Sequence, residues 1–158
     1  MSVERFRGRV WEPACGDGMM SKVLETKYRV ISTDVADRGY GEPGVDFLAQ
    51  TKARAPNIVT NPPFNLINAF VPKALSLTTG KVALLARLSF LEGTRRRVIF
   101  TTTPLARVWV FSGRVAIPHA RFRRDGYVNK DDKGGMIAFA WYVWEHGHEG
   151  PPALGWLE

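Results

Sequence analysis

Up to about residue 100, the pattern of apolar and polar positions defines two kinds of segment that alternate along the chain, short strand-like runs and longer helical ones. Short runs rich in β-branched and aromatic residues predict strands at 9–12, 29–33, 45–47, 58–60, 81–88, 105–111 and 136–144. Longer amphipathic segments predict helices at 19–27, 66–77 and 92–100, and Pro72 should bend or divide the second of these. This order predicts an α/β fold with a mostly parallel seven-stranded sheet and helices on both faces.

A long connection, and not a helix, joins the last two expected strands, 105–111 and 136–144. Antiparallel neighbours need no crossover helix between them. We therefore expect these strands to form an antiparallel C-terminal hairpin at one edge of the sheet. The 158 residues fit a single domain, 1–158, without a separate recognition domain.

The first expected strand ends in a glycine loop, Glu12-Pro13-Ala14-Cys15-Gly16-Asp17-Gly18, which opens a helix. Gly16 and Gly18 let the backbone approach a ligand closely and adopt positive φ at low cost. The loop lacks the full spacing of a dinucleotide fingerprint, and no Lys-Ser or Lys-Thr pair follows as in a phosphate-binding loop. The carboxylates of Glu12 and Asp17 instead favour a cationic ligand, such as a sulfonium that carries an amino-acid ammonium group.

Two later acidic residues extend this candidate site. Asp34 ends the strand 29–33 and lies 18 residues after Gly16, close to the roughly 20 at which an acidic residue binds ribose hydroxyls in nucleoside-binding βαβ units. A local turn is the alternative for Asp34. Asp46 could accept from the adenine amino group of a cofactor, with Phe47 packing on the ring, or it could cap a helix that begins near Leu48.

The tetrapeptide Asn61-Pro62-Pro63-Phe64 directly follows the expected strand 58–60. Methylation of the exocyclic amino group of a base requires acceptors that restore tetrahedral character at a delocalised nitrogen. The side-chain oxygen of Asn61 and the rigidly held carbonyl of Pro62 are two such acceptors. Phe64 could stack on the base, a contact worth about 1–3 kcal/mol. The alternative is an ordinary turn, which Asn-Pro and Pro-Pro both favour.

In order and spacing these motifs resemble those of S-adenosylmethionine-dependent amino-methyltransferases that act on DNA adenine. The similarity is greatest to small phage- and prophage-type enzymes, because the stretches 84–93 and 138–144 also resemble theirs. The resemblance implies a Rossmann-like class I methyltransferase fold with S-adenosylmethionine as cofactor. It assigns cofactor binding to Glu12, Pro13, Ala14, Cys15, Gly16, Gly18, Asp34, Val35, Asp46 and Phe47, and catalysis to Asn61, Pro62, Pro63 and Phe64.

Enzymes of that family usually carry a helical segment before the glycine strand, which helps to cover the methionine end of the cofactor. Here about ten residues precede Trp11. We expect this wall to come from another part of the chain or from a partner subunit, or the cofactor to bind weakly.

The charge balance indicates a polyanionic partner. The chain has 22 Lys and Arg against 15 Asp and Glu, a formal charge of +7, and DNA is the expected partner. The connection 113–135 mixes cations with aromatics, which suits a nucleic-acid backbone and an unstacked base, although a solvated loop is the alternative. The residues expected to contact DNA are Arg121, Phe122, Arg123, Arg124 and Lys130. Arg95-Arg96-Arg97 could touch phosphates, but a solvated helix face is the simpler interpretation.

The sequence disfavours disulfide-bonded, membrane-spanning, secreted and metal-binding proteins. Cys15 is the only cysteine, which excludes an internal disulfide, fits a reducing cytosol and suits a small buried spacer. No stretch has the length of a membrane span or the pattern of a signal peptide, so we expect a cytoplasmic protein. His146 and His148 lack further ligands, and no metal is expected. Trp141, Trp144 and Trp156 are interpreted as edge-strand core.

Adenine in DNA is thus the expected substrate. A glutamine side chain in a protein and an amino group in RNA are alternative substrates for the same chemistry. The amino group of cytosine is a less suitable substrate, because enzymes that methylate it usually carry Ser in place of Asn61. A different class is a non-catalytic module that keeps the fold to bind DNA or a partner. The oligomeric state is left open, with a homodimer as one option.

Overall fold

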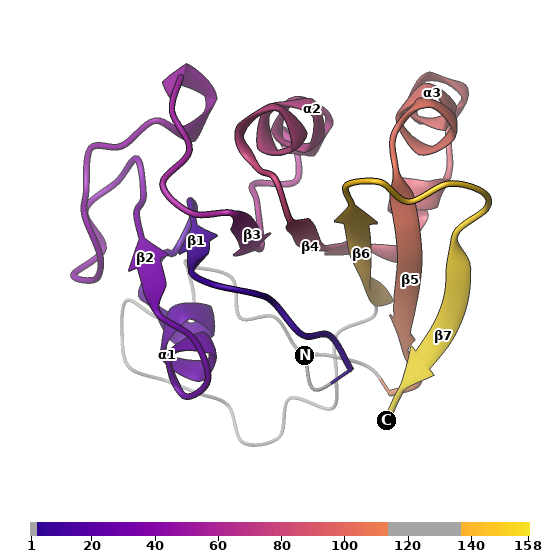
Figure 1. The fold of residues 1–158 in the computed structure, drawn as a ribbon. Helices are drawn as coiled ribbons and strands as arrows, with labels where there is room; N and C mark the ends of the chain where they lie inside the picture. Colours follow the sequence, from indigo (N-terminus) through magenta and orange to yellow (C-terminus); the bar gives the residue numbers. More distant parts are fainter. Residues whose placement is uncertain (1–2, 114–136) are drawn as a thin grey trace.

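The structure is a computed structural model that describes residues 3–113 and 137–158 (Figure 1). Its strands are β1 (Val10–Glu12), β2 (Val30–Ser32), β3 (Asn57–Thr60), β4 (Lys81–Arg87), β5 (Leu105–Phe111), β6 (Phe139–Glu145) and β7 (Ala153–Leu157). Its helices are α1 (Met19–Glu25), α2 (Ile67–Leu77) and α3 (Thr94–Thr102), together with the 3-10 helices η1 (Phe47–Ala49) and η2 (Leu88–Leu91). The strands form one sheet in the order β2-β1-β3-β4-β6-β5-β7.

Parallel pairing joins β2, β1, β3 and β4, whereas β6 is antiparallel to both β4 and β5. Helix α1 covers one face of the sheet, and α2 and α3 cover the other (Figure 1). The predicted fold class, a Rossmann-like and mostly parallel sheet with helices on both faces, is confirmed. The predicted antiparallel pairing of the strands now labelled β5 and β6 is confirmed as well.

The predicted position of that hairpin at the sheet edge is wrong. Strand β7 pairs in parallel with β5 along its whole length and takes the edge itself. Trp156 on β7 is 65% exposed, so its predicted place in the core is also wrong, whereas Trp141 and Trp144 are buried. An outermost strand has only one neighbour and one covered face, which leaves such a side chain open to solvent.

Two further predictions about local structure are corrected. The expected strand 45–47 does not form, because Asp46 Oδ1 accepts from the backbone N–H of Leu48 at 2.9 Å and starts η1. Of the two outcomes expected from Pro72, a bend or a division, the division is wrong, since α2 runs without interruption from Ile67 to Leu77 with Pro72 inside it. The bend stays a prediction.

The sheet separates two apolar clusters that follow the alternation of side chains along each strand. Trp11, Ile58 and Tyr142 lie in the cluster beneath α2 and α3. On the α1 face, the second cluster includes Val59 and also Phe6, which precedes the first strand. The segment before β1 therefore contributes to the core and helps to cover this face.

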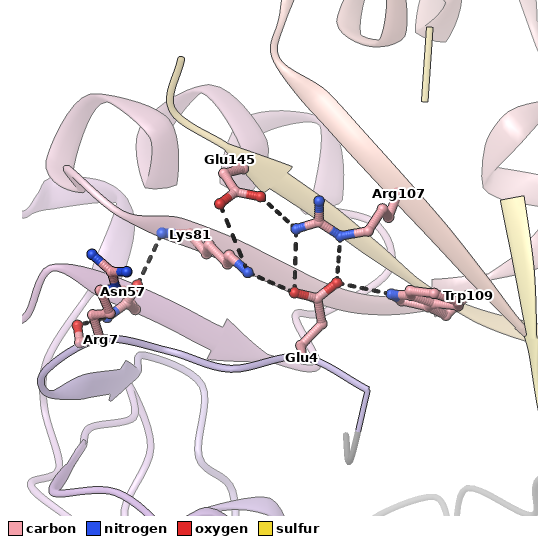
Figure 2. A network of polar contacts seen from close by, with 7 residues as sticks. All are labelled: Glu4, Arg7, Asn57, Lys81, Arg107, Trp109 and Glu145. Carbon is pink, nitrogen blue, oxygen red and sulfur yellow. Dashed lines mark hydrogen bonds and ion pairs between the residues drawn. The ribbon is translucent and has the colours of Figure 1, made fainter. Parts of the chain in front are cut away.

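Glu4 fastens that segment to the sheet (Figure 2). Its carboxylate is buried and accepts from Lys81 Nζ at 2.8 Å, from Trp109 Nε1 at 3.0 Å and from the Arg107 guanidinium. Burial alone would raise the pKa of Glu4, but the hydrogen bonds from Arg107, Lys81 and Trp109 outweigh it and hold the pKa below its ordinary value. Arg107 is shared with Glu145, whose Oε2 lies 2.6 Å from its Nη2.

Asn57 forms a second anchor for the same segment (Figure 2). Its Nδ2 donates to the carbonyls of Arg7 at 2.8 Å and Arg9 at 3.1 Å, and its Oδ1 accepts from the backbone N–H of Lys81. Asn57 and Lys81 begin β3 and β4, so these contacts lie at the amino ends of the strands. The segment is thus bound at the end of the sheet opposite to the predicted site, and it does not supply the expected cofactor wall.

Candidate active site

The predicted site residues converge on the carboxyl ends of neighbouring parallel strands. Strand β1 ends at Glu12 before the glycine loop, β2 is followed by Asp34, β3 by Asn61, and β4 ends at Arg87. The chain moves outward from β1 to β2 and then places β3 on the other side of β1. Ligands of open α/β sheets bind at such a switch point, outside the carboxyl ends of the strands.

The two loop glycines serve different purposes. Both have positive φ, 57° at Gly16 and 81° at Gly18. A Cβ on Gly18 would lie 2.3 Å from the ring of Tyr40, so this glycine is required by packing. At Gly16 no atom lies within 4 Å of the position that a Cβ would take, which leaves open space beside the loop for a ligand.

Asp34 links the glycine loop to the second strand. It is 7% exposed, and its Oδ2 accepts from the backbone N–H of Gly16 at 2.8 Å. Its Oδ1 accepts from the N–H of Ala36 at 2.9 Å, so the local turn weighed for this residue is present. An ionised carboxylate has about four acceptor positions, and two remain for ribose hydroxyls. That contact remains a prediction.

Glu12 lies beneath the loop and is almost fully buried. It accepts from the Ser21 hydroxyl, which also lies 2.6 Å from the Ser32 hydroxyl. Burial raises the pKa of Glu12 to about 8, because the charged form loses its hydration there. A cation bound above the loop would favour the ionised form.

The remaining loop residues are largely structural. Pro13 is buried and Ala14 packs against the core beneath α2 and α3. Cys15 is 4% exposed, and burial raises the pKa of its thiol to about 11. These values agree with the predicted buried spacer, since a reactive cysteine needs a lowered pKa.

Two roles were predicted for Asp46, a helix cap and an acceptor for the adenine amino group. Asp46 caps η1 through Leu48, as one of the two interpretations expected. Phe47 is 2% exposed and its ring packs against Trp11 and Phe70 in the core. Its packing on an adenine ring stays a prediction. Val35, by contrast, is 67% exposed beside Asp34 and offers an apolar surface at the strand end.

At the end of β3, Asn61 presents an acceptor without a partner. Its Oδ1 is buried and forms no hydrogen bond within the described residues, and the same holds for the hydroxyl of Thr60. The turn into α2 uses the carbonyl of Pro63, which accepts from Leu66 N–H at 2.9 Å, and not that of Pro62. Native proteins seldom leave a buried polar atom unsatisfied unless a ligand completes it.

Phe64, three residues after Asn61, borders a cavity of about 230 Å³ that Asn65, Ile67 and Ala86 also line. Its ring lies 5.9 Å from that of Phe139, and the guanidinium of Arg87 lies 4.8 Å from its centroid. Phe90 and Arg96 line the same cavity. Arg87 was not among the residues predicted for the site, although it directly follows the buried apolar run of β4.

The residues expected to contact DNA, Arg121, Phe122, Arg123, Arg124 and Lys130, lie outside the described residues. In the described ranges, no three or more His, Cys, Asp or Glu side chains gather in a way that could hold a metal ion. No helix within those ranges is long and apolar enough to cross a membrane.

The fold that this sheet and its strand-end site define is found in solved methyltransferase structures. A dimethyladenosine transferase from Plasmodium falciparum has a TM-score of 0.55 and 15% identity, over 88% of this chain and 55% of that protein. A predicted O-methyltransferase from Agrobacterium tumefaciens has a TM-score of 0.63 and 12% identity, over 98% and 82% of the two chains.

A third similar structure contains ligands. It is the 16S rRNA N2 G1207 methyltransferase of T. Thermophilus in complex with AdoMet and guanosine, with a TM-score of 0.52 and 16% identity, over 95% of this chain and 38% of that one. The chain thus spans only part of the length of the dimethyladenosine transferase and of the rRNA methyltransferase. No protein-family model and no curated protein matches it.

Proposed function

We propose that the protein transfers a methyl group from S-adenosylmethionine to the exocyclic amino group of adenine in DNA. The observation that carries the proposal is the buried Oδ1 of Asn61 at the carboxyl end of β3, which has no hydrogen-bond partner among residues 3–113 and 137–158. The next residue, Pro62, would supply a second acceptor through its carbonyl, since the turn into α2 bonds to the carbonyl of Pro63 instead. Two acceptors at one strand end suit an NH₂ group, which has two hydrogens to donate.

The residues around the glycine loop fit the cofactor. Open space beside Gly16 admits a ligand close to the backbone, and the carboxylates of Glu12 and Asp34 match a cation and a pair of ribose hydroxyls. When bound there, S-adenosylmethionine would supply an electrophilic methyl group on a positively charged sulfur. Glu12 would hold compensating negative charge below the loop, and Asp34 would orient the ribose.

Asn61 and Pro62 act on the amino nitrogen. Hydrogen bonds from its two N–H groups to these oxygens draw the lone pair out of the ring and direct it at the methyl carbon. The bonds strengthen as positive charge develops on the nitrogen, so they stabilise the transition state more than the ground state. The amino nitrogen would take the methyl group with release of a neutral thioether, and it would pass its surplus proton to water.

The base must leave the DNA stack to reach this position. Extrusion costs a few kcal/mol, and stacking on Phe64 returns about 1–3 kcal/mol. The Arg87 guanidinium lies over the Phe64 ring and would share it with the base. The formal charge of +7 supports a nucleic-acid substrate.

RNA is the second candidate, because one similar structure is named for rRNA N2 methylation. The test is parallel incubation of unmethylated DNA and RNA with the protein and S-adenosylmethionine, followed by mass spectrometry of the nucleosides. Methylated deoxyadenosine supports the proposal, and methylated nucleosides from RNA alone would replace DNA by RNA. Absence of cofactor binding by calorimetry would favour a non-catalytic module.

A further inference from the structure

Two arginines line the cavity beside Phe64, and neither is paired with a carboxylate in the described ranges. Arg87 ends β4, and Arg96 lies on the inward side of α3. Among the described residues neither arginine forms an ion pair, while Arg38, Arg54 and Arg107 each do. Partly buried cations that are left without a counter-ion favour an anionic ligand.

Aromatic rings support both guanidinium groups. Arg87 lies 4.8 Å from the centroid of Phe64, and Arg96 lies 5.4 Å from that of Phe90. A stacked guanidinium keeps its N–H groups in the plane of the group, where they can still form paired hydrogen bonds to an anion. Arg87 Nε is buried and has no acceptor in the described part of the chain. An acceptor atom brought into the cavity would satisfy it.

The backbone beneath these side chains is firmly held. The Tyr142 hydroxyl, in a fully buried residue, donates to the carbonyls of Arg87 at 3.1 Å and Leu88 at 3.2 Å. Arg96 donates from its guanidinium to the carbonyl of Ser89 at 3.1 Å. Both cations are thus positioned before a ligand arrives, which lowers the entropic cost of binding.

We infer that this cavity is an anion subsite that binds a backbone phosphate of the nucleic acid next to the target nucleotide. The inference deepens the proposed function and rests on it. A phosphate here would lie beside the Asn61 to Phe64 segment, so it would fix the nucleotide whose base enters that segment. Two arginines suit a phosphodiester group, because their planar donor sets match its oxygens in geometry and charge.

The test compares Arg87→Gln and Arg96→Gln with Arg95→Gln and Arg97→Gln. The control residues Arg95 and Arg97 lie on α3 with Arg96, are exposed and do not line the cavity. The affinity for a fluorescein-labelled DNA duplex is measured by anisotropy across a salt series, with S-adenosylhomocysteine present. Each cavity variant should bind about tenfold more weakly at low salt, as for a lost charge-assisted hydrogen bond. Its slope of log K against log salt should decrease by about 0.9.

At about 0.15 M salt, where the Debye length is about 8 Å, the control variants should change affinity by less than about twofold, because exposed charges are screened there. Arg87→Lys should restore the salt slope, since it keeps the charge, but only part of the affinity, since it loses the planar fork. Thermal unfolding and cofactor binding of each variant identify any general loss of fold.

Equal losses in cavity and control variants overturn the inference, and so does an unchanged salt slope in Arg87→Gln. If the unaltered protein methylates DNA but cavity and control variants lose DNA affinity equally, the proposed function stands and only the subsite is rejected. A selective loss of DNA binding in the cavity variants, without methylation of any nucleoside, would keep the subsite and reject the proposed reaction. Failure of the unaltered protein to bind DNA or RNA overturns both.

Discussion

The backbone N–H of Gly16 donates a 2.8 Å hydrogen bond to Oδ2 of Asp34. Together with the bond from Cys15 N–H to the Thr33 carbonyl, this contact joins the loop after β1 to the end of β2. The two bonds fix the two walls between which the cofactor is proposed to lie. The same carboxylate also accepts from Ala36, and it is almost fully removed from solvent. Asp34 is therefore both a structural anchor and a candidate ligand.

Replacement of Asp34 by Asn should weaken both roles. The amide has one oxygen, so one of the two backbone N–H groups of Gly16 and Ala36 loses its acceptor and faces an NH₂ group. We expect a loss of about 1–3 kcal/mol in the free energy of unfolding, together with weaker cofactor binding. Urea unfolding and calorimetry measure the two effects. Asp37→Asn, at an exposed position, is the control, and equal behaviour of the two variants would contradict this account.

The two loop glycines allow stability and ligand binding to be separated. Gly16→Ala meets no atom within 4 Å, so it should cost only about 1 kcal/mol for its positive φ but greatly weaken cofactor binding. Gly18→Ala forces a Cβ into the ring of Tyr40 and should cost about 2–4 kcal/mol, for overpacking and φ together. Denaturant unfolding and cofactor titration of both variants check the difference. Undiminished cofactor affinity in Gly16→Ala would show that the open space is not the ligand site.

The raised pKa of Glu12 predicts proton release on cofactor binding. With a folded pKa of about 8 against an ordinary 4.5, the carboxyl is mostly protonated at pH 7 in the free protein. A bound cation favours ionisation, so up to one proton should leave. Calorimetry in buffers of different ionisation enthalpy detects this release. Glu12→Gln should abolish it, and the same buffer dependence in that variant would refute the role.

The sign of the corresponding stability change follows from the same pKa. Since the folded pKa lies above the unfolded value, the contribution of Glu12 is fully present below pH 4.5 and is lost as pH rises through about 8. The unaltered protein should therefore lose stability relative to Glu12→Gln between these two values. Parallel urea titrations at several pH values measure the difference, which should level off above pH 8.

The Glu4 network predicts the opposite dependence on pH. Because its hydrogen bonds hold the pKa of Glu4 below the ordinary 4.5, its contribution is present above that value and is lost as pH falls through the folded pKa. Glu4→Gln leaves the half-buried charges of Arg107 and Lys81 less compensated, and should cost at most about 3–5 kcal/mol at neutral pH. Cofactor affinity should be unchanged, since the network lies at the amino ends of the strands. Unfolding curves from pH 3 to 7 test this, and a pH-independent difference between the two proteins would argue against it.

Periodicity and turn chemistry predicted most of the central fold. Helices α1, α2 and α3 and six of the seven strands lie where apolar patterns placed them, because each buries a continuous face. The expected strand 45–47 failed because the Asp46 side chain competes for backbone N–H groups that a strand would need. Strand β7 was missed because an edge strand depends on pairing with a distant partner, which no local pattern reveals.

The candidate site was predictable to a similar extent. Asn61 and Gly16 were found because their residue types are rare solutions to specific geometric needs. The core position of Phe47 and the place of Arg87 over Phe64 depend on packing between elements far apart in sequence. Such contacts become visible only in the folded structure.

The most direct test of the central claim is the yield of methylated deoxyadenosine from unmethylated DNA, measured by mass spectrometry for three proteins. These are the unaltered protein, Asn61→Ala and Asn68→Ala, in which an exposed asparagine of α2 undergoes the same chemical change. We predict methylated deoxyadenosine from the unaltered protein and from Asn68→Ala. In Asn61→Ala the yield should fall by at least about a hundredfold, as for removal of one transition-state hydrogen bond. Cofactor binding should be equal in all three proteins. Full activity in Asn61→Ala, or no methylated base from the unaltered protein with cofactor bound, would contradict the account.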